Sequence, residues 1–494
     1  MTNEVVYGMP LLLIMALSVV MLLVDAFTGK NKIIAYYFSI FSLLVVAASA
    51  ALTISPDVDP GFIETPMSGT SMVFGGYAAF FDIIFCVAGI LTIFASRPYL
   101  KREYGEYKEY YSLILFAITG MMLISHSNSL LMLFIGIELM SIVFYVLSGF
   151  IRTRVTAVES ALKYFLLGSF ASGFLLYGMA LLYGATGTIV FPEILKSILS
   201  GSADMTFIRV GFALILIGLA FKAAAFPFHQ WAPDVYHGAP TVSTAFMSTA
   251  GKAAALIAFI IVAKAIIPTD IAVSNITDVT IKLADFTDTS RMIIAIIAAL
   301  TMLIGNISAV VQKNVKRMLA YSSVAHAGYL MMGIVANNEN GWSGIMFYAT
   351  AYMFMQIGSF VIVGVIERNN ERMNFEDYSG LRKNHPWLAA LMAIFMFSLA
   401  GIPPFAGFPG KYMLFVGAVE SGFTWLTIVA VVSTIISMYF YIGLVLNMYF
   451  KDNDNPFVVT DISSARITLA ISVIFVFLLG ILPNSLIELA KQLF

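Results

Sequence analysis

Four ionisable residues lie inside stretches of the chain that are otherwise apolar enough to cross a lipid bilayer. They are Lys222, Lys252, Lys411 and Glu138. A charged side chain at mid-membrane depth costs about 2.5 to 3.5 kcal/mol, so such residues normally face a protein interior or a water-filled cavity. The pattern therefore predicts an ion or proton path.

Lysine and glutamate suit proton transfer because their surroundings control whether they hold a proton. Desolvation disfavours the charged form of a buried lysine, whereas a nearby carboxylate favours it. We expect Glu138 to be the counter-charge of Lys222, so that a change in the pairing changes the proton affinity of Lys222. Two alternatives stay open: a static ion pair that only orders the bundle, and, for Lys411, a side chain that snorkels to the outer surface.

Other ionisable residues are weaker candidates for the same path. His326 lies on a polar stripe, residues 321–329, that could carry a water wire, although a hydrogen-bonded core histidine fits equally well. Lys163 stands four residues after Glu159, so a local helical ion pair also explains it. His229 lies beside an expected break in the apolar helices, where proton uptake or loop capping would both suit it.

Composition excludes most other classes of protein. Of the 494 residues, 60% are hydrophobic and 11% are charged, against roughly 25% charged in soluble domains. The net charge of −1 gives no sign of a nucleic-acid partner. The single cysteine, Cys86, rules out a disulfide within the chain and a cysteine-bound iron–sulfur cluster, and no nucleotide, flavin or metal motif is present. Any redox chemistry is expected in partner proteins.

Apolar windows of about 20 residues predict an all-α integral membrane protein of about fourteen spans, in one polytopic domain over residues 1–494. The longest connections, near residues 193–206 and 268–288, are too short for a soluble domain. Basic residues gather in alternate loops, which should face the cytoplasm. The loops on the opposite side contain few lysines or arginines. An example is the loop that holds Asp57, Asp59 and Glu64. An even number of spans then places both termini outside.

Two apolar segments, residues 208–236 and 387–417, should be broken helices. Each is about 30 residues, too long for one straight crossing, and prolines such as Pro227 and Pro409 remove backbone N–H groups. Paired breaks in two halves indicate an internally repeated transporter. The expected parts are spans 1–3 in residues 1–109, a first five-helix repeat of spans 4–8 in 110–267, an inverted second repeat of spans 9–13 in 289–450, and span 14 in 465–494.

Four stretches of sequence resemble a known family. They are residues 133–141 (LFIGIELMS), 161–173 (ALKYFLLGSFASG), 221–240 (FKAAAFPFHQWAPDVYHGAP) and 317–323 (RMLAYSS). These stretches resemble the antiporter-like membrane subunits of respiratory NADH:quinone oxidoreductase, complex I, and the resemblance extends over nearly the whole chain. It is strongest to the N-type subunits, because Lys411 follows Phe-Pro-Gly where the M-type subunit usually has glutamate.

The resemblance implies a hydrophilic axis onto which Glu138, Lys222, Lys252 and Lys411 map. It implies a proton-translocating subunit of an enzyme complex in a bacterial inner membrane, beside other antiporter-like and small membrane subunits. NADH, FMN, iron–sulfur clusters and quinone are expected in partner subunits and no cofactor in this chain. Glu138 is expected to gate, Lys252 to relay, and Lys411 to pass the proton outward.

Three alternatives to this function stay open. The first is a subunit of a multisubunit Na⁺/H⁺ antiporter, which shares the fold without electron transfer. The second is a subunit of a related ferredoxin- or F420H2-dependent complex. The third is a scaffold in which the buried lysines are structural.

Overall fold

The protein is a bundle of long helices. The computed structural model describes residues 2–28, 32–54, 71–103, 105, 107–267, 278–368, 371–452 and 462–493. Within that part of the chain there are nineteen α-helices, one short 3-10 helix and no β-strand. The helices are α1 (Thr2–Phe27), α2 (Lys32–Thr53), α3 (Gly76–Glu103), α4 (Glu109–Ser125), α5 (Leu130–Ser148), α6 (Val155–Thr186), α7 (Phe191–Leu199), α8 (Met205–Ala223), α9 (Trp231–Gly238), α10 (Thr241–Ile266), α11 (Asp278–Val310), α12 (Val315–Ala336), α13 (Glu339–Ile366), η1 (Phe375–Tyr378), α14 (Leu381–Asn384), α15 (Pro386–Ala400), α16 (Gly407–Glu420), α17 (Thr424–Phe450), α18 (Ala465–Ile481) and α19 (Asn484–Gln492).

The all-α membrane fold is confirmed. Each predicted apolar window holds a helix in the described part of the chain. Among the described residues, 11 helices are long and apolar enough to cross a membrane alone, or up to 12 if the bent pair α18 and α19 forms one span. Helices α4 and α15, with 17 and 15 residues, are apolar but shorter. The total of fourteen spans stays a prediction.

Two connections contain more helix than the sequence indicated. Residues 193–206 include most of α7, whose apolar side chains Phe191, Ile194 and Ile198 are buried on one face. A helix of 9 residues is too short to register in a window of about 20 residues. Helix α11 starts at Asp278, within the connection expected over residues 268–288. The acidic loop with Asp57, Asp59 and Glu64 lies outside the described residues.

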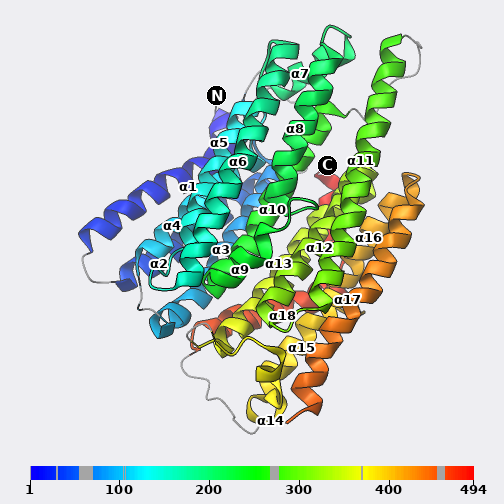
Figure 1. Ribbon diagram of the computed structural model, residues 1–494. Helices are drawn as coiled ribbons and strands as arrows, with labels where there is room; N and C mark the ends of the chain where they lie inside the picture. Colours follow the sequence, from blue (N-terminus) through cyan, green and yellow to red (C-terminus); the bar gives the residue numbers. More distant parts are fainter. Residues whose placement is uncertain are drawn as a thin grey trace.

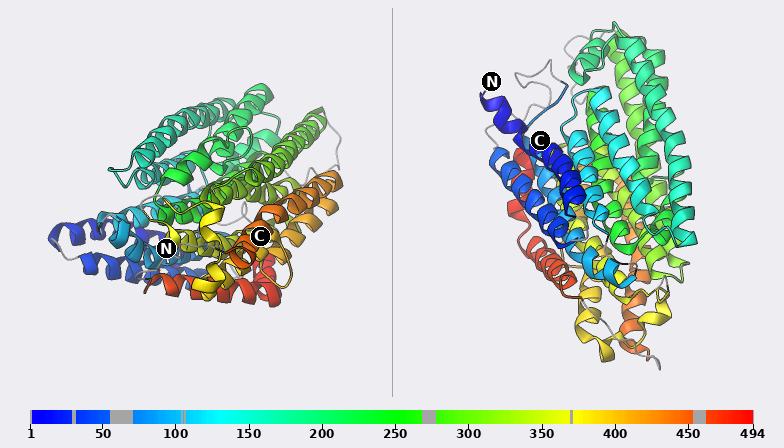
Figure 2. Two further views of the ribbon diagram at one scale, coloured as in Figure 1. Left: turned by 60° about the horizontal axis from the view of Figure 1, so that its bottom comes forward. Right: turned by 90° about the vertical axis from the view of Figure 1, so that its left-hand side faces the viewer.

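Three helices lie at the centre of the bundle, and two of them carry candidate residues, Lys252 on α10 and His326 on α12. Figures 1 and 2 show α10, α12 and α13 between the α5, α6 and α8 group and the α11, α16 and α17 group. The apolar windows of α10, α12 and α13 are 100%, 94% and 94% buried, whereas those of α6 and α17 are 39% buried. The outer helices therefore supply the surface that can face lipid, whereas the inner helices are surrounded by other helices.

Both predicted helix breaks are confirmed. Helix α8 ends at Ala223 and is capped by Ala224 in a left-handed conformation, with φ of 57°. Helix α15 ends at Ala400 and is capped by Gly401, with φ of 86°. In each case the cap N–H bonds to carbonyls three and four residues back, the pattern of a left-handed helix stop. The helices before the two breaks therefore end with the same type of cap. The boundaries of the inverted repeats stay a prediction.

Pro409 has a different place from the one expected. It is the third residue of α16, in the first turn, where its missing N–H costs no helical hydrogen bond. The carbonyl of Phe405, four residues before Pro409, accepts the N–H of Phe408 at 3.2 Å. Pro409 therefore helps to begin α16, and its expected role as a breaker is wrong.

Candidate functional site

The predicted partnership of Glu138 and Lys222 is present. Lys222 lies in the last turn of α8, beside the first break, and Glu138 lies in the middle of α5. The Lys222 Nζ is 3.9 Å from the Glu138 Oε1, and the two side chains are 2% and 26% exposed. A buried ammonium therefore faces a carboxylate that keeps partial access to its surroundings.

Hydroxyl groups surround this pair. Lys222 Nζ donates to Ser141 Oγ at 2.7 Å and to Tyr145 OH at 3.4 Å, while Ser172 Oγ donates to Glu138 Oε1 at 2.5 Å. Glu138, Ser141 and Tyr145 share one face of α5 because they are three and four residues apart. The spacing is visible in the sequence and marks these three side chains as neighbours on one helix face. Since Lys222 has these acceptors, the ion pair can lengthen without leaving the ammonium unsatisfied.

Lys252 has uncharged partners. It is buried near the middle of α10, and its Nζ donates to the backbone carbonyl of Ser323 and to Ser323 Oγ, the latter at 2.8 Å. Among the described residues, no carboxylate lies within ion-pair distance of it. Ser248 and Thr249, which precede Lys252 on α10, donate to the carbonyl of Ala245. Lys252 is thus bound across the interface between α10 and α12.

His326 occupies the polar stripe of α12, as expected. Its Nδ1 lies 2.6 Å from Tyr348 OH on α13, and its Nε2 lies 3.0 Å from Tyr441 OH on α17. Tyr441 OH also shares a hydrogen bond with Ser322 Oγ. His326 is therefore a hydrogen-bonded core residue, and it belongs to a chain of groups that can exchange protons.

Lys411 stays inside the bundle and does not snorkel. Its Nζ donates to the carbonyls of Leu399 and Ala400 at 3.0 and 3.3 Å. Pro403 and Pro404 cannot supply the N–H groups that these two carbonyls would accept in a continuous helix. The ammonium of Lys411 takes their place, so the second break is satisfied by the lysine that follows it.

An aromatic ring lies between Lys411 and His326. Lys411 Nζ is 4.7 Å from the ring centroid of Tyr329, a distance at which a cation and an aromatic face attract. The Tyr329 ring is 5.7 Å from the His326 ring. Ser323, His326 and Tyr329 thus lie at three-residue spacing on α12, with Lys252 beside the first and Lys411 beside the last.

Three of the weaker candidates lie elsewhere. Lys163 is 43% exposed and pairs with Glu159 at 2.7 Å and with Asp234 at 3.2 Å, so the local ion pair is confirmed. His229 and Pro227 lie in the turn that follows α8. Among the described residues, no group of three or more His, Cys, Asp or Glu is placed to hold a metal.

A second buried group of charges was not foreseen. Glu367, just after α13, is fully buried and pairs with Arg154 at 3.0 Å, and Arg154 also pairs with Glu103 at 3.2 Å. Tyr99 OH donates to Glu367 at 3.1 Å, and Thr241 Oγ1 donates to it as well. These groups, named here the Glu367 cluster, join α3, the connection before α6, the start of α10 and the end of α13. In the sequence, Glu367 and Arg368 directly follow an apolar segment, which is typical of an exposed polar loop and gives no sign of burial.

Lys316 completes the Glu367 cluster. Its fully buried Nζ donates at 2.7 Å to the carbonyl of Ala239, which lies between α9 and α10. Burial raises the pKa of Glu367, but the charges of Lys316 and Arg154 outweigh this effect and leave the pKa below its usual value. Glu367 is therefore a carboxylate at neutral pH, and it holds the start of the helix that carries Lys252.

Comparison with known proteins identifies the family by sequence. Residues 127–437 match the family described as NADH:quinone oxidoreductase/Mrp antiporter, TM. The NADH-quinone oxidoreductase subunit N 1 of Chloroherpeton thalassium is 43% identical, over 100% of this chain and 98% of the relative. The subunit N of Trichlorobacter lovleyi is 41% identical, over 98% of this chain and 96% of the relative.

Solved structures agree with the sequence comparison. A chain of respiratory complex I from Thermus thermophilus matches with a TM-score of 0.78 and 30% identity, over 98% of this chain and 99% of that chain. A chain of the Mrp complex from Dietzia matches with a TM-score of 0.83 over 99% of this chain and 96% of that chain, but at 22% identity it shows a shared fold alone. The chain therefore belongs to the subunit N family of NADH-quinone oxidoreductases.

Proposed function

We propose that this chain is the proton-translocating membrane subunit of an NADH:quinone oxidoreductase. Protons move through Glu138, Lys222, Lys252 and Lys411, while NADH, FMN, iron–sulfur clusters and quinone act in partner subunits. The observation that carries the proposal is that all three lysines are buried among polar partners within the bundle. Membership of the subunit N family supports the assignment to this complex.

The first step depends on how firmly Lys222 holds its proton. When the ion pair with Glu138 is close, the carboxylate favours the ammonium; when it opens, the proton is held less firmly. Ser141 and Tyr145 stay within hydrogen-bond distance of Nζ, and each hydroxyl can relay a proton by taking one and releasing its own. Glu138 thereby acts as the gate.

Lys222 and Lys252 have separate partners, and we infer that water between them carries the proton. In the described part of the chain, no hydrogen bond or ion pair joins the two side chains directly. Beyond Lys252, the hydroxyl of Ser323, the His326 ring and the hydroxyls of Tyr348 and Tyr441 provide the groups for a relay. Lys411 receives the proton at the second break and passes it outward.

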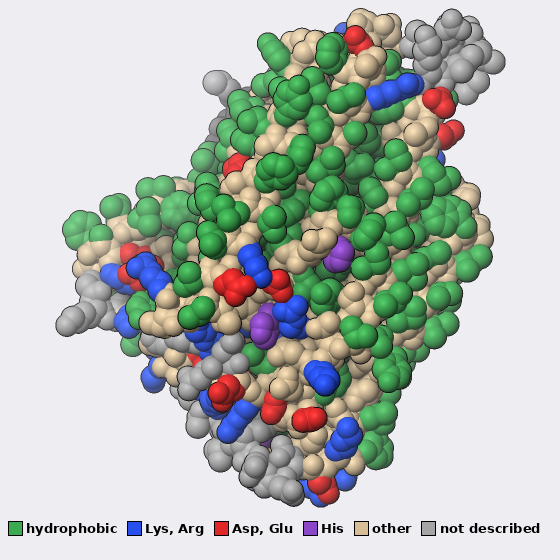
Figure 3. Space-filling model, in the orientation of Figure 1, with side chains coloured by type: hydrophobic (Ala, Val, Ile, Leu, Met, Phe, Trp, Pro, Cys, Tyr) green, Lys and Arg blue, Asp and Glu red, His purple; other side chains and the backbone are tan. Residues whose placement is uncertain are grey.

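The setting of the chain follows from the same proposal. It lies in a bacterial inner membrane beside other antiporter-like and small membrane subunits, and helices α4–α10 and α11–α17 form the inverted repeats. Most charged side chains on one face gather toward the end that holds α14, whereas hydrophobic side chains cover the middle (Figure 3). Both ends of the chain lie away from α14 (Figures 1 and 2), in support of termini on the outer side.

Replacing Lys252 by methionine tests the relay. Methionine keeps most of the apolar bulk and removes the titratable group, so we expect NADH-driven proton translocation by the whole complex to fall by at least about tenfold. The measurement is acidification of proteoliposomes that contain the purified complex, with quinone reduction followed in parallel.

The matched control for this test is Lys264→Met on the same helix. Lys264 lies in the last turn of α10, 4.8 Å from the ring centroid of Trp342, and outside the polar region around Ser323. We expect the control to keep most of the translocation. Equal losses in both variants would show that any change of a lysine in α10 harms the bundle, and the relay would have no support.

A further inference from the structure

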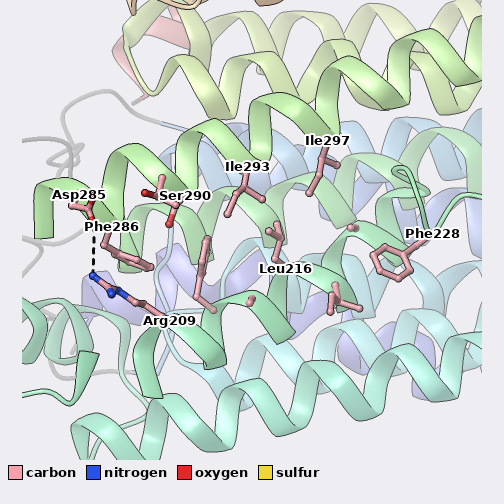
Figure 4. A pocket seen from close by; sticks show the side chains of 13 residues that line it. Arg209, Leu216, Phe228, Asp285, Phe286, Ser290, Ile293 and Ile297 are labelled. Atoms are coloured by element: carbon pink, nitrogen blue, oxygen red, sulfur yellow. Dashed lines mark ion pairs between the residues drawn. The ribbon is translucent and has the colours of Figure 1, made fainter. Parts of the chain in front are cut away.

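A groove separates α8 from α11 on the outside of the bundle. Its volume is about 420 Å³, and all its lining residues come from α8, α11 and Phe228 in the first break. Helix α8 packs mainly on α6 and α10, whereas α11 packs mainly on α12 and α17. The two walls thus belong to different packing groups, and side chains leave the space between them open (Figure 4).

The groove is apolar along its length and charged at one end. Phe212, Leu216 and Ala220 form its α8 wall at four-residue spacing, opposite Phe286 and Ile297 of α11. At the end near the start of α8, the Arg209 guanidinium is 3.7 Å from the Asp285 carboxylate (Figure 4). These side chains are 49% and 73% exposed, so the ion pair is open to other partners.

The length of the groove matches one leaflet of a bilayer. From Arg209 to Ala220 the α8 wall rises about 16 Å, at 1.5 Å per residue. Half of a hydrocarbon core is about 15 Å thick. The groove therefore has the length and the apolar lining that suit a single acyl chain.

The charged end selects the head group. A guanidinium binds a phosphate through paired hydrogen bonds, and a carboxylate beside it can accept hydrogen bonds from an ammonium. Arg209 and Asp285 together complement a head group that carries both charges. An anionic lipid with no ammonium would leave Asp285 facing a second negative charge.

We propose that this groove binds one phosphatidylethanolamine molecule. Its phosphate lies at Arg209, its ammonium at Asp285, and one acyl chain extends along Leu216 to Phe228. The end of that chain contacts the segment that follows Lys222. The lipid is thus in contact with the first helix break from the membrane side.

Photo-crosslinking tests the site. The intact complex is reconstituted into vesicles that contain phosphatidylethanolamine with a diazirine near the end of one acyl chain, and labelled peptides are found by mass spectrometry after illumination. We expect labelling of the peptides around Phe228 and Ile297. Ala213→Trp, which fills the groove from α8, is expected to reduce that labelling about tenfold, a loss of about 1.4 kcal/mol in binding free energy.

The matched control is Val210→Trp, one turn from Ala213 on the exposed surface of α8 but outside the groove lining. It should label like the unchanged complex. Equal loss in both variants, or no label at these peptides in the unchanged complex, would overturn the site.

Head-group selection is tested without any substitution. The same diazirine acyl chain on phosphatidylglycerol should label the groove peptides less than on phosphatidylethanolamine. Equal or stronger labelling by phosphatidylglycerol would overturn the assignment of the ammonium to Asp285. None of these readouts depends on proton translocation, so the lipid site can fail while the proposed function stands.

Discussion

A complex that carries Lys222→Met in this chain is expected to lose NADH-driven proton translocation by at least about tenfold. Lys222 contacts both the Glu138 carboxylate and the hydroxyls of Ser141 and Tyr145. Methionine fills similar space but cannot hold a proton. The Glu138 carboxylate then has no ammonium whose proton affinity it could change. The measurement is the initial rate of acidification of proteoliposomes, divided by the rate of quinone reduction.

Lys163→Met provides the control for this experiment. Lys163 also pairs with carboxylates, but its side chain is 43% exposed and its partners Glu159 and Asp234 are at the surface. Exposed pairs of this kind are worth about 0 to 1 kcal/mol, so the control should assemble and translocate nearly as the unchanged complex does. If Lys222→Met left translocation intact, the scaffold interpretation of the buried lysines would be favoured over the proton path.

Removing the charge of Glu367 is expected to have the largest effect on stability. Breaking a buried ion pair by changing one partner costs about 3 to 5 kcal/mol, because the other charge is left uncompensated. In Glu367→Gln, Arg154 loses one of its two carboxylate ion pairs, the other being with Glu103, and Lys316 loses the nearby negative charge. We expect a lower unfolding temperature of the membrane part of the purified complex, measured by intrinsic fluorescence. Glu376→Gln, at an exposed carboxylate, is the control and should change stability by less than about 0.5 kcal/mol.

The pH dependence of this effect follows from the lowered pKa of Glu367. A carboxyl whose pKa is lower in the folded state stabilises the fold above its unfolded pKa, and the contribution is lost as pH falls through the folded pKa. The difference between the unchanged protein and Glu367→Gln should therefore be constant near neutral pH and shrink only below about 4.5. A difference that vanished between pH 6 and pH 8 would contradict the ionised state assigned to Glu367.

The candidate axis was predictable from the sequence because charge and apolar context are both local properties. Lys222, Lys252 and Lys411 stand out since each interrupts a run of apolar residues long enough to enter a membrane. The breaks beside Lys222 and Lys411 follow from proline and glycine, which act on the backbone within a few residues. The same local reasoning misplaced Pro409, because its effect depends on where the next helix begins.

The partners of these residues could not be predicted, because they come from helices far apart in the chain. Ser323 binds Lys252 across 71 residues, and Tyr441 reaches His326 across 115 residues. Serine and tyrosine occur throughout the apolar spans, so nothing local marks the ones that meet a lysine.

Composition and apolar windows are enough to predict a membrane bundle, and the cost of a charge in lipid is enough to place the lysines inside it. Which groups satisfy those charges depends on how the helices pack. The tertiary structure joins Glu367 to Arg154 and Thr241, and it leaves a groove between α8 and α11. These features depend on the packing of distant helices, and the order of residues along any one helix does not encode which neighbour it meets.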